Sequence, residues 1–321
     1  MKAPLLIVRV ARKISEAESI ASFELIPVEG NELPAFSAGA HIDVHLPGRL
    51  VRQYSLCNAP SEIHRYVICV LRDASGRGGS RVLHDVVKEG DTLEISFPKN
   101  HFPLARSAQR SVLLAGGIGV TPILCMAEHL AAQGEDFEMH YCARSVNRMA
   151  FIERIVASSF ASRVALHFDD GPEHQKLELE SFLTKRGNDT HLYICGPQGF
   201  MDAVLATARG NGWPEAQLHY EFFRRDLTSS GPDQGFQVRL AHSGRVINVT
   251  ADQTVVEALA DAGIEVPTSC EQGICGTCLT QVLEGEPDHR DMYLTREEHE
   301  ANDCFLPCCS RARSAMLVLD L

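Results

Sequence analysis

The segment Ser269-Cys270-Glu271-Gln272-Gly273-Ile274-Cys275-Gly276-Thr277-Cys278 carries three closely spaced thiols. Their C-x4-C-x2-C spacing, with Cys308 after 29 further residues, is typical of plant-type [2Fe–2S] proteins. Gly273 and Gly276 allow the loop to fold tightly, so that backbone N–H groups can point at the cluster sulfurs. A structural zinc site is the alternative, but such sites usually combine C-x2-C pairs or add histidines, and only one such pair occurs here. The segment therefore predicts an iron–sulfur domain.

The fourth cluster ligand is not settled by spacing, because Cys308 and Cys309 are neighbours. Adjacent side chains in an extended segment point in opposite directions, so only one of the two can bind iron. We expect the remaining cysteines outside the motif to be ordinary buried or surface thiols; these are Cys304, Cys57, Cys69, Cys125 and Cys142.

Composition and charge restrict the class of protein. The 321 residues are 45% apolar, yet no run approaches the roughly 20 apolar residues of a membrane span. Charged residues at Arg9, Arg12 and Lys13 interrupt the first apolar stretch, so we expect no signal peptide, a cytoplasmic location and reduced thiols. The net charge of −12 opposes binding to nucleic acid or anionic membranes and favours a basic protein partner.

Hydrophobic periodicity divides the chain into three domains and a linker. Residues 1–101 alternate short strands with turns and predict an antiparallel β-barrel, with apolar residues at period two in 41–46. Residues 102–225 alternate strands with helices, which predicts a parallel sheet covered on both faces. Turn-forming residues dominate 226–235, the expected linker. Residues 236–321 contain a hairpin, a helix and a terminal strand, so the fold class is multidomain, β followed by α/β and α+β.

Two glycine-rich turns in the second domain suggest a nucleotide site. Gly116-Gly117-Ile118-Gly119-Val120-Thr121-Pro122 follows an apolar strand and opens a helix, where small residues and free N–H groups suit a diphosphate or nicotinamide. Cys195-Gly196-Pro197 also follows a strand. Each alone is equally typical of a simple tight turn, but parallel strands end at one edge of a sheet, where ligands collect.

The first domain offers a second ligand site. Arg52 supplies a fixed cation, Tyr54 an aromatic ring and Ser55 a hydroxyl on one expected strand. These groups can hold a phosphate, stack on a flat heterocycle and bond a ring nitrogen. An exposed strand with ordinary alternation is the alternative. The turn Gly76-Arg77-Gly78-Gly79-Ser80, at an expected helix start, adds a second set of phosphate donors and favours the ligand site.

Taken together, these segments resemble the phthalate dioxygenase reductase family over essentially all 321 residues. The resemblance rests on R-x-Y-S, on G-G-x-G-x-T-P, on C-G-P and on the thiol motif. Further matching pieces are 52–58, 77–80, 288–291 and 308–312. It implies a flavin-binding barrel, a nucleotide-binding α/β domain and a β-grasp ferredoxin domain. It also implies a monomer that passes electrons from NADH through FMN and the cluster to a Rieske oxygenase.

The same resemblance assigns residues to each cofactor. The FMN site would comprise Arg52, Gln53, Tyr54, Ser55, Cys69, Val70, Leu71, Gly78, Gly79 and Ser80. The nicotinamide site would comprise Gly117, Gly119, Thr121, Cys195, Gly196 and Pro197, with Phe223 beside the flavin. Ser55, Thr121, Cys195 and Phe223 would form the catalytic group, and Cys270, Cys275, Cys278 and Cys308 would ligate iron.

Some alternatives stay open in the sequence. A carboxylate of Asp169 or Asp170 would favour NADH by repelling a 2′-phosphate, whereas Arg144 would favour NADPH. The other functions considered are a reductase for another protein or a small acceptor, and a ferredoxin-like carrier whose reductase domains are vestigial. Residues 236–321 hold 14 acidic residues against 6 arginines and no lysine, which predicts an acidic surface near the cluster.

Overall fold

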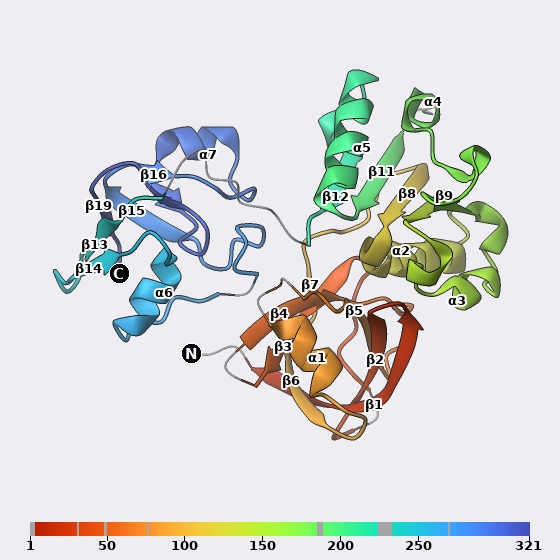
Figure 1. Ribbon diagram of the computed structural model, residues 1–321, viewed down its shortest axis with the longest axis horizontal. Coiled ribbons are helices and arrows are strands. Elements are labelled where there is room, and N and C mark those ends of the chain that lie inside the picture. Colours follow the sequence, from red (N-terminus) through yellow and green to blue (C-terminus); the bar gives the residue numbers. More distant parts are fainter. Residues whose placement is uncertain are drawn as a thin grey trace. The chain divides into compact units, whose positions relative to one another are not determined.

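The computed structural model describes residues 4–30, 32–47, 50–74, 76, 78–184, 189–223, 233–268 and 270–321. It divides into two compact units, Met1–Phe223 and Arg224–Leu321. Figure 1 shows the barrel and the parallel sheet of the first unit and the smaller second unit. No helix in the described ranges is long and apolar enough to span a membrane. Of the expected linker 226–235, residues 226–232 lie outside the described ones.

The first half of unit one is an antiparallel sheet curled around an apolar interior. Its strands follow the order β4-β3-β6-β1-β2-β5, with β7 beside β3. Ile42, Val44 and Leu46 point into the interior, as their period-two spacing predicts. The two outer strands approach each other at a single bridge between Leu56 and Ile68. The elements are β1 (Leu5–Ala17), β2 (Ile20–Pro27), β3 (Ala40–Leu46), β4 (Leu50–Ser55), β5 (Tyr66–Leu71), α1 (Gly79–Asp85), β6 (Thr92–Ser96) and β7 (Lys99–Asn100).

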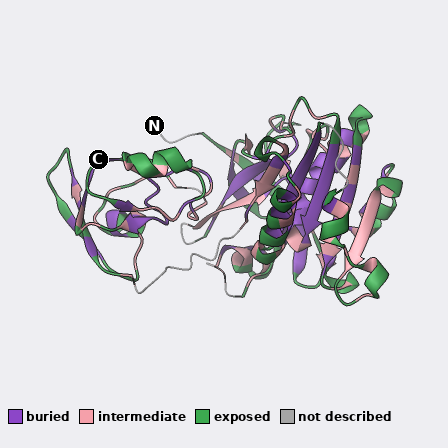
Figure 2. Cartoon of the chain, turned by 90° about the horizontal axis from the view of Figure 1, so that it is seen from above, coloured by how far each residue is buried: buried purple, intermediate pink, exposed green. Residues whose placement is uncertain are grey.

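The second half of unit one is a five-stranded parallel sheet of order β10-β9-β8-β11-β12. Helices α2 and α3 lie on one face and α4 and α5 on the other (Figure 1). Buried residues concentrate on its strands (Figure 2). The elements are β8 (Arg110–Gly116), α2 (Val120–Gln133), β9 (Asp136–Ala143), α3 (Ile152–Val156), β10 (Val164–Phe168), α4 (Leu179–Thr184), β11 (Thr190–Cys195), α5 (Gln198–Gly210) and β12 (Leu218–Glu221).

The second unit is a five-stranded sheet of order β14-β13-β19-β15-β17, with β16 and β18 forming a separate ribbon. Helix α6 packs its Val255, Ala258 and Leu259 into the core. The elements are β13 (Phe236–Leu240), β14 (Val246–Val249), α6 (Val255–Asp261), β15 (Thr280–Glu284), β16 (Pro287–Asp288), α7 (Arg296–Ala301), β17 (Cys304–Phe305), β18 (Arg311–Ala312) and β19 (Met316–Leu319).

These architectures confirm the expected fold class. The sequence pattern missed helix α7, because none of its residues is buried and it shows no apolar periodicity. Its only sequence signal is a capping box, in which Thr295 and Glu298 bond each other's backbone N–H groups. The helix expected to start at the turn 76–80 is α1, which begins at Gly79 and ends at Asp85. The structure divides the chain into two units only. We propose the finer domain boundaries 1–101, 102–225, 226–235 and 236–321.

Candidate functional site

The two glycine-rich turns meet at the carboxyl edge of the parallel sheet. From β8 the chain moves outward to β9 and β10, then returns to β11 on the other side of β8. This reversal of strand order is where open α/β sheets form a ligand crevice. A Cβ atom on Gly119 would lie only 2.2 Å from the carbonyl oxygen of Cys195, so the close approach of the two turns requires glycine there. Thr121, buried at the start of α2, donates its hydroxyl to the Ile118 carbonyl at 3.1 Å.

A partly buried carboxyl group lies beside these turns. Glu221, at the end of β12, is in register with Cys195 on β11 and accepts a hydrogen bond from the Ser55 hydroxyl at 3.4 Å. Burial raises the pKa of Glu221 to about 7, and the Ser55 bond partly opposes that rise. Burial and the nearby Glu221 also raise the pKa of the Cys195 thiol. Ser55 comes from the antiparallel half of unit one, whereas Cys195 and Glu221 come from the parallel sheet. Both halves therefore supply polar groups to the expected flavin–nicotinamide junction.

Glu221 is a site residue that the sequence interpretation missed. Its only signal is a single carboxylate at the end of the last strand, directly before Phe222 and Phe223. Phe223, the expected flavin neighbour, is partly buried and packs against the apolar core of the parallel sheet. The structure thus brings Ser55, Cys195 and Glu221 together.

The expected phosphate-binding groups of the barrel are also adjacent. The side chain of Arg52, on β4, crosses the first residue of α1, because a Cβ on Gly79 would lie 2.4 Å from Arg52 Cγ. Arg52 Nη1 donates to the Val51 carbonyl at 2.7 Å. The Ser80 hydroxyl accepts from the Asp73 N–H at 3.1 Å. Arg52 therefore lies beside Gly79 at the start of α1, while Arg77 lies outside the described residues.

Gln53 and Tyr54, which follow Arg52 on β4, differ in their surroundings. Burial raises the pKa of the Tyr54 hydroxyl, while the nearby Arg52 opposes that rise. Gln53 lies with its Nε2 atom 3.1 Å from His41 Nε2. Tyr54 thus stays neutral at physiological pH and keeps its ring partly covered.

The segment Cys69–Leu71 differs from the other expected flavin residues. Cys69 packs in the apolar core shared with the parallel sheet, Val70 points into the barrel interior, and Leu71 is 40% exposed. These side chains face three environments, so one ligand cannot contact all three of them, whereas the backbone is common to all. The Val70 carbonyl accepts from His84 Nε2 of α1 at 2.8 Å, which ties this edge of β5 to the helix.

The four motif cysteines of unit two converge. The Cys270 sulfur interacts with the thiols of Cys275 and Cys308, which lowers the pKa of Cys270. Cys278 also interacts with Cys308, and its pKa is lowered as well. The backbone N–H groups of Gln272 and Ile274 donate to Cys270 Sγ at 3.3 and 3.5 Å. Converging cysteine sulfurs with amide donors are the ligand set that a [2Fe–2S] cluster requires.

Cys309 occupies a different environment from Cys308. Its buried sulfur lies 3.7 Å from the Leu306 carbonyl and 3.7 Å from the Ser310 hydroxyl. Cys270 and Cys278 both interact with Cys308. This arrangement supports Cys308 as the fourth ligand.

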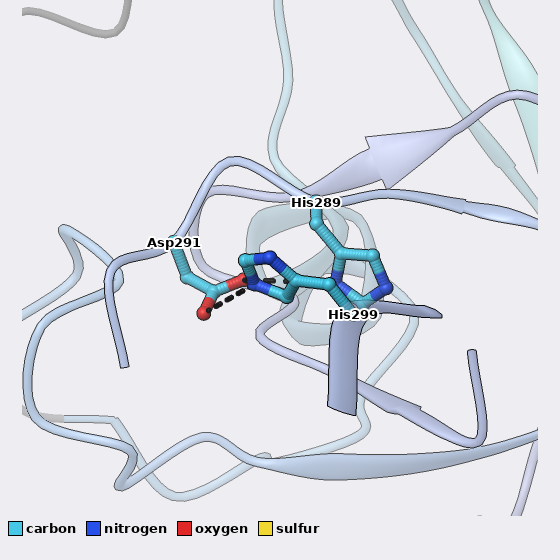
Figure 3. A group of neighbouring side chains, drawn as sticks. All are labelled: His289, Asp291 and His299. Atoms are coloured by element: carbon cyan, nitrogen blue, oxygen red, sulfur yellow. Dashed lines mark hydrogen bonds and ion pairs between the residues drawn. The ribbon is translucent and has the colours of Figure 1, made fainter. Parts of the chain in front are cut away.

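A group that sequence spacing did not reveal is His289, Asp291 and His299 (Figure 3). The Asp291 carboxylate accepts from the Leu294 N–H at 2.9 Å and from His299 Nε2 at 3.2 Å. The two imidazole rings stack, with centroids 4.4 Å apart and 24° between their planes. One ligand atom of each residue lies within 4.8 Å of the others, and His289 Nε2 lies 3.2 Å from Asn302 Oδ1 at the end of α7, so the group joins α7 to the segment before it.

Comparisons with known proteins agree with this geometry. Residues 238–313 match the 2Fe-2S iron-sulfur cluster binding domain family. The chain is 55% identical to vanillate O-demethylase oxidoreductase of Pseudomonas putida, over 97% of this chain and 98% of that protein. It is 41% identical to phthalate dioxygenase reductase of Burkholderia cepacia, over 98% and 96%.

The same likeness holds in three dimensions. A solved structure of phthalate dioxygenase reductase, described as modular for electron transfer from pyridine nucleotides to [2Fe-2S], superposes with a TM-score of 0.81. That match has 41% identity and covers 99% of this chain and 98% of the other. The chain therefore belongs to the family of oxygenase reductases that includes phthalate dioxygenase reductase and vanillate O-demethylase oxidoreductase.

Proposed function

We propose that this protein is the reductase component of a Rieske-type aromatic oxygenase or O-demethylase, transferring electrons from NADH through FMN and a [2Fe–2S] cluster to the oxygenase. The observation that carries the proposal is the presence, on one chain, of a nucleotide crevice and four converging thiols. A flavin, when bound, supplies the conversion between the two-electron chemistry of nicotinamide and the one-electron chemistry of the cluster.

Arg52 and the segment Gly78–Ser80 would hold the flavin phosphate. Their adjacency at the start of α1 supports this assignment, because a guanidinium and backbone N–H groups both bind phosphate. Tyr54 would cover one face of the flavin ring, and Gln53, Ser55 and the backbone of Cys69–Leu71 would bond its polar edge. A single terminal phosphate, as in FMN, needs no further adenosine site on the barrel.

Mass spectrometry of the flavin released by heat or acid tests this assignment directly. We expect FMN. Release of FAD would contradict the FMN proposal while leaving the flavin site itself in place.

The meeting of the two glycine-rich turns supports a nicotinamide site. Gly117, Gly119 and Thr121 would accommodate the cofactor on one side, with Cys195, Gly196 and Pro197 on the other. Phe223 would lie beside the flavin. The neutral pair of Glu221 and Cys195 would then leave the crevice without a fixed negative charge below about pH 7, which favours approach of an anionic dinucleotide.

The preference for NADH rests on the ends of β9 and β10. Asp169 and Asp170 are exposed there, and the Asp170 N–H donates to the Arg144 carbonyl at 3.2 Å. Their carboxylates would disfavour a 2′-phosphate. Comparing kcat/KM for NADH and NADPH tests this, and we expect the higher value with NADH.

Cys270, Cys275, Cys278 and Cys308 would ligate the cluster. The reduction potential of plant-type clusters is about −400 mV, and that of Rieske centres is about −150 to +300 mV. Electron transfer to a Rieske oxygenase is therefore downhill. The test is anaerobic addition of NADH to the holoprotein, followed by electron paramagnetic resonance. A reduced [2Fe–2S] signal is expected; flavin-free protein that does not oxidise NADH would instead favour a carrier with vestigial reductase domains.

The acidic residues of unit two suit a basic surface on the oxygenase. Glu297, Glu298, Glu300 and Asp303 are all exposed on or after α7, in the segment that leads to Cys308. A single copy of the chain holds every proposed cofactor site, so we propose that the reductase acts as a monomer.

A further inference from the structure

His289 in unit two has a buried ring nitrogen with no hydrogen-bond partner among the described residues. The side chain is only 8% exposed, and its Nδ1 atom lies 3.6 Å from Asp291 Oδ1, beyond hydrogen-bond distance. On the other side of the ring, Nε2 donates to Asn302 Oδ1 at 3.2 Å. That bond places the proton on Nε2 and leaves a lone pair on Nδ1, as the outer partner of a metal-binding histidine does. A buried nitrogen in this state calls for a water or an ion.

The carboxylate beside this nitrogen has no arginine or lysine partner in the described ranges. The Asp291 side chain is 0% exposed and forms ion pairs only with the two histidines. The N–H groups of Tyr293 and Leu294 donate to Oδ2 at 3.2 and 2.9 Å, and the Ser310 hydroxyl donates to Oδ1 at 3.4 Å. These donors orient the carboxylate but give its charge no fixed counterion. An uncompensated buried charge is costly, so a cation would be favoured here.

His299, on α7, completes the group (Figure 3). Its Nε2 atom lies 3.2 Å from each oxygen of Asp291. Tetrahedral zinc holds nitrogen and oxygen ligands at about 2.0–2.1 Å, which places neighbouring ligand atoms roughly 3.3–3.5 Å apart. The observed separations of 3.2 and 3.6 Å are close to that range, so small movements of the side chains would enclose one cation. The His299 side chain is 31% exposed, which leaves an entry path.

We propose that His289 Nδ1, His299 Nε2 and one oxygen of Asp291 bind a divalent cation of the zinc type, with a water as the fourth ligand. Two imidazoles and one carboxylate suit such a cation, whereas Mg²⁺ takes oxygen ligands. Binding requires neutral His299 with its proton on Nδ1. The proposal goes beyond the electron-transfer function and does not depend on a flavin, a dinucleotide or an oxygenase.

The cation would join α7 to the segment that packs on the cluster loop. The Met292 N–H donates to the Gly273 carbonyl at 2.9 Å, and a Cβ on Gly273 would lie 2.9 Å from Asp291 Cα. Helix α7 has no buried residue of its own, so few other contacts hold it in place. We therefore expect zinc to increase the protection of the α7 amides against hydrogen exchange.

The test adds Zn²⁺ at equimolar concentration to the full-length protein loaded with flavin and cluster, followed by gel filtration and elemental analysis. We expect one zinc per chain with the iron content unchanged. X-ray absorption at the zinc edge should show nitrogen and oxygen ligands at about 2.0–2.1 Å and no sulfur at about 2.3 Å. Excess Mg²⁺ should not displace the zinc.

Two variants locate the site. Competition with a fluorescent zinc chelator should show that His289→Gln and His299→Gln each raise the Kd at least about tenfold, since even the loss of an outer partner costs that much. His299→Gln changes a partly exposed helical residue, so the test does not depend on whether the buried His289 variant folds. In His299→Gln, added zinc should leave hydrogen exchange of α7 unchanged.

His242→Gln is the matched control. His242 also belongs to unit two and its Nε2 atom lies 3.1 Å from Asp320 Oδ1, but its side chain is 72% exposed and no third ligand joins the pair in the described ranges. This variant should keep the zinc affinity of the unsubstituted protein. No retained zinc, an unchanged Kd in His299→Gln, an equal rise in His242→Gln, or zinc bound by sulfur as iron is lost would each overturn the proposal.

Discussion

Replacing Glu221 with Gln should change how the stability of unit one depends on pH. The folded chain raises the pKa of this carboxyl from 4.5 to about 7, chiefly because burial disfavours the charged form. Below pH 4.5 the group is protonated in both the folded and the unfolded chain, so no stability is lost. Between pH 4.5 and about 7 only the unfolded chain releases the proton, and stability falls as pH rises.

The size of this loss follows from the pKa difference. Each tenfold change in proton affinity corresponds to roughly 1.4 kcal/mol, which gives about 3 kcal/mol for a rise from 4.5 to about 7. Partial exposure of the side chain reduces this to about 2 kcal/mol. Glutamine does not titrate, so the Glu221→Gln variant should gain about 2 kcal/mol relative to the unsubstituted protein between pH 5 and pH 8.

The assay is urea unfolding of flavin-free protein, followed by tryptophan fluorescence. The chain has one tryptophan, Trp213, which is buried in unit one and donates its indole N–H to the Leu183 carbonyl at 2.8 Å. Its emission therefore reports on this unit alone. A difference in unfolding free energy that stays constant from pH 5 to pH 8 would refute the reasoning.

The control for this experiment is Glu215→Gln. Glu215 is exposed, and its ion pair with Arg209 at 2.6 Å lowers its pKa. The stabilisation it contributes is lost only as pH falls into the acidic range, so this variant should show no pH-dependent difference from pH 5 to pH 8.

Three further predictions concern the electron path. Cys275→Ser should abolish NADH-driven reduction of a one-electron protein acceptor while NADH still bleaches the flavin; loss of bleaching in a folded variant would contradict the order of cofactors. Arg52→Ala should remove a charge-assisted phosphate contact worth about 1.5–3 kcal/mol, so that flavin binds about ten- to a hundredfold more weakly; flavin content after gel filtration measures this, and no change would make Arg52 a surface cation. The second-order rate of acceptor reduction should fall about three- to tenfold from low to physiological ionic strength, with flavin reduction by NADH nearly constant; a rate independent of salt would remove the electrostatic argument.

The sequence by itself determined the features that depend on local spacing. The C-x4-C-x2-C loop, the period-two strand at His41–Leu46 and the glycine-rich turn before α2 each form from neighbouring residues, so their patterns were readable without a structure. The alternation of strands and helices likewise predicted the parallel sheet, because each element shows its own periodicity.

Only the tertiary structure decided which distant residues meet. Ser55 and Glu221 are 166 residues apart and share a hydrogen bond, and Asp233 reaches Arg290 over 57 residues. Isolated charged residues have no periodicity, so nothing in the chain marks such a pair before the sheets place them. Helix α7 was missed because none of its residues is buried, and its position depends on the contact of His299 with Asp291. Cys308 and Cys309 are equivalent in sequence, whereas backbone direction at the end of the loop gives Cys308 the contacts with Cys270 and Cys278.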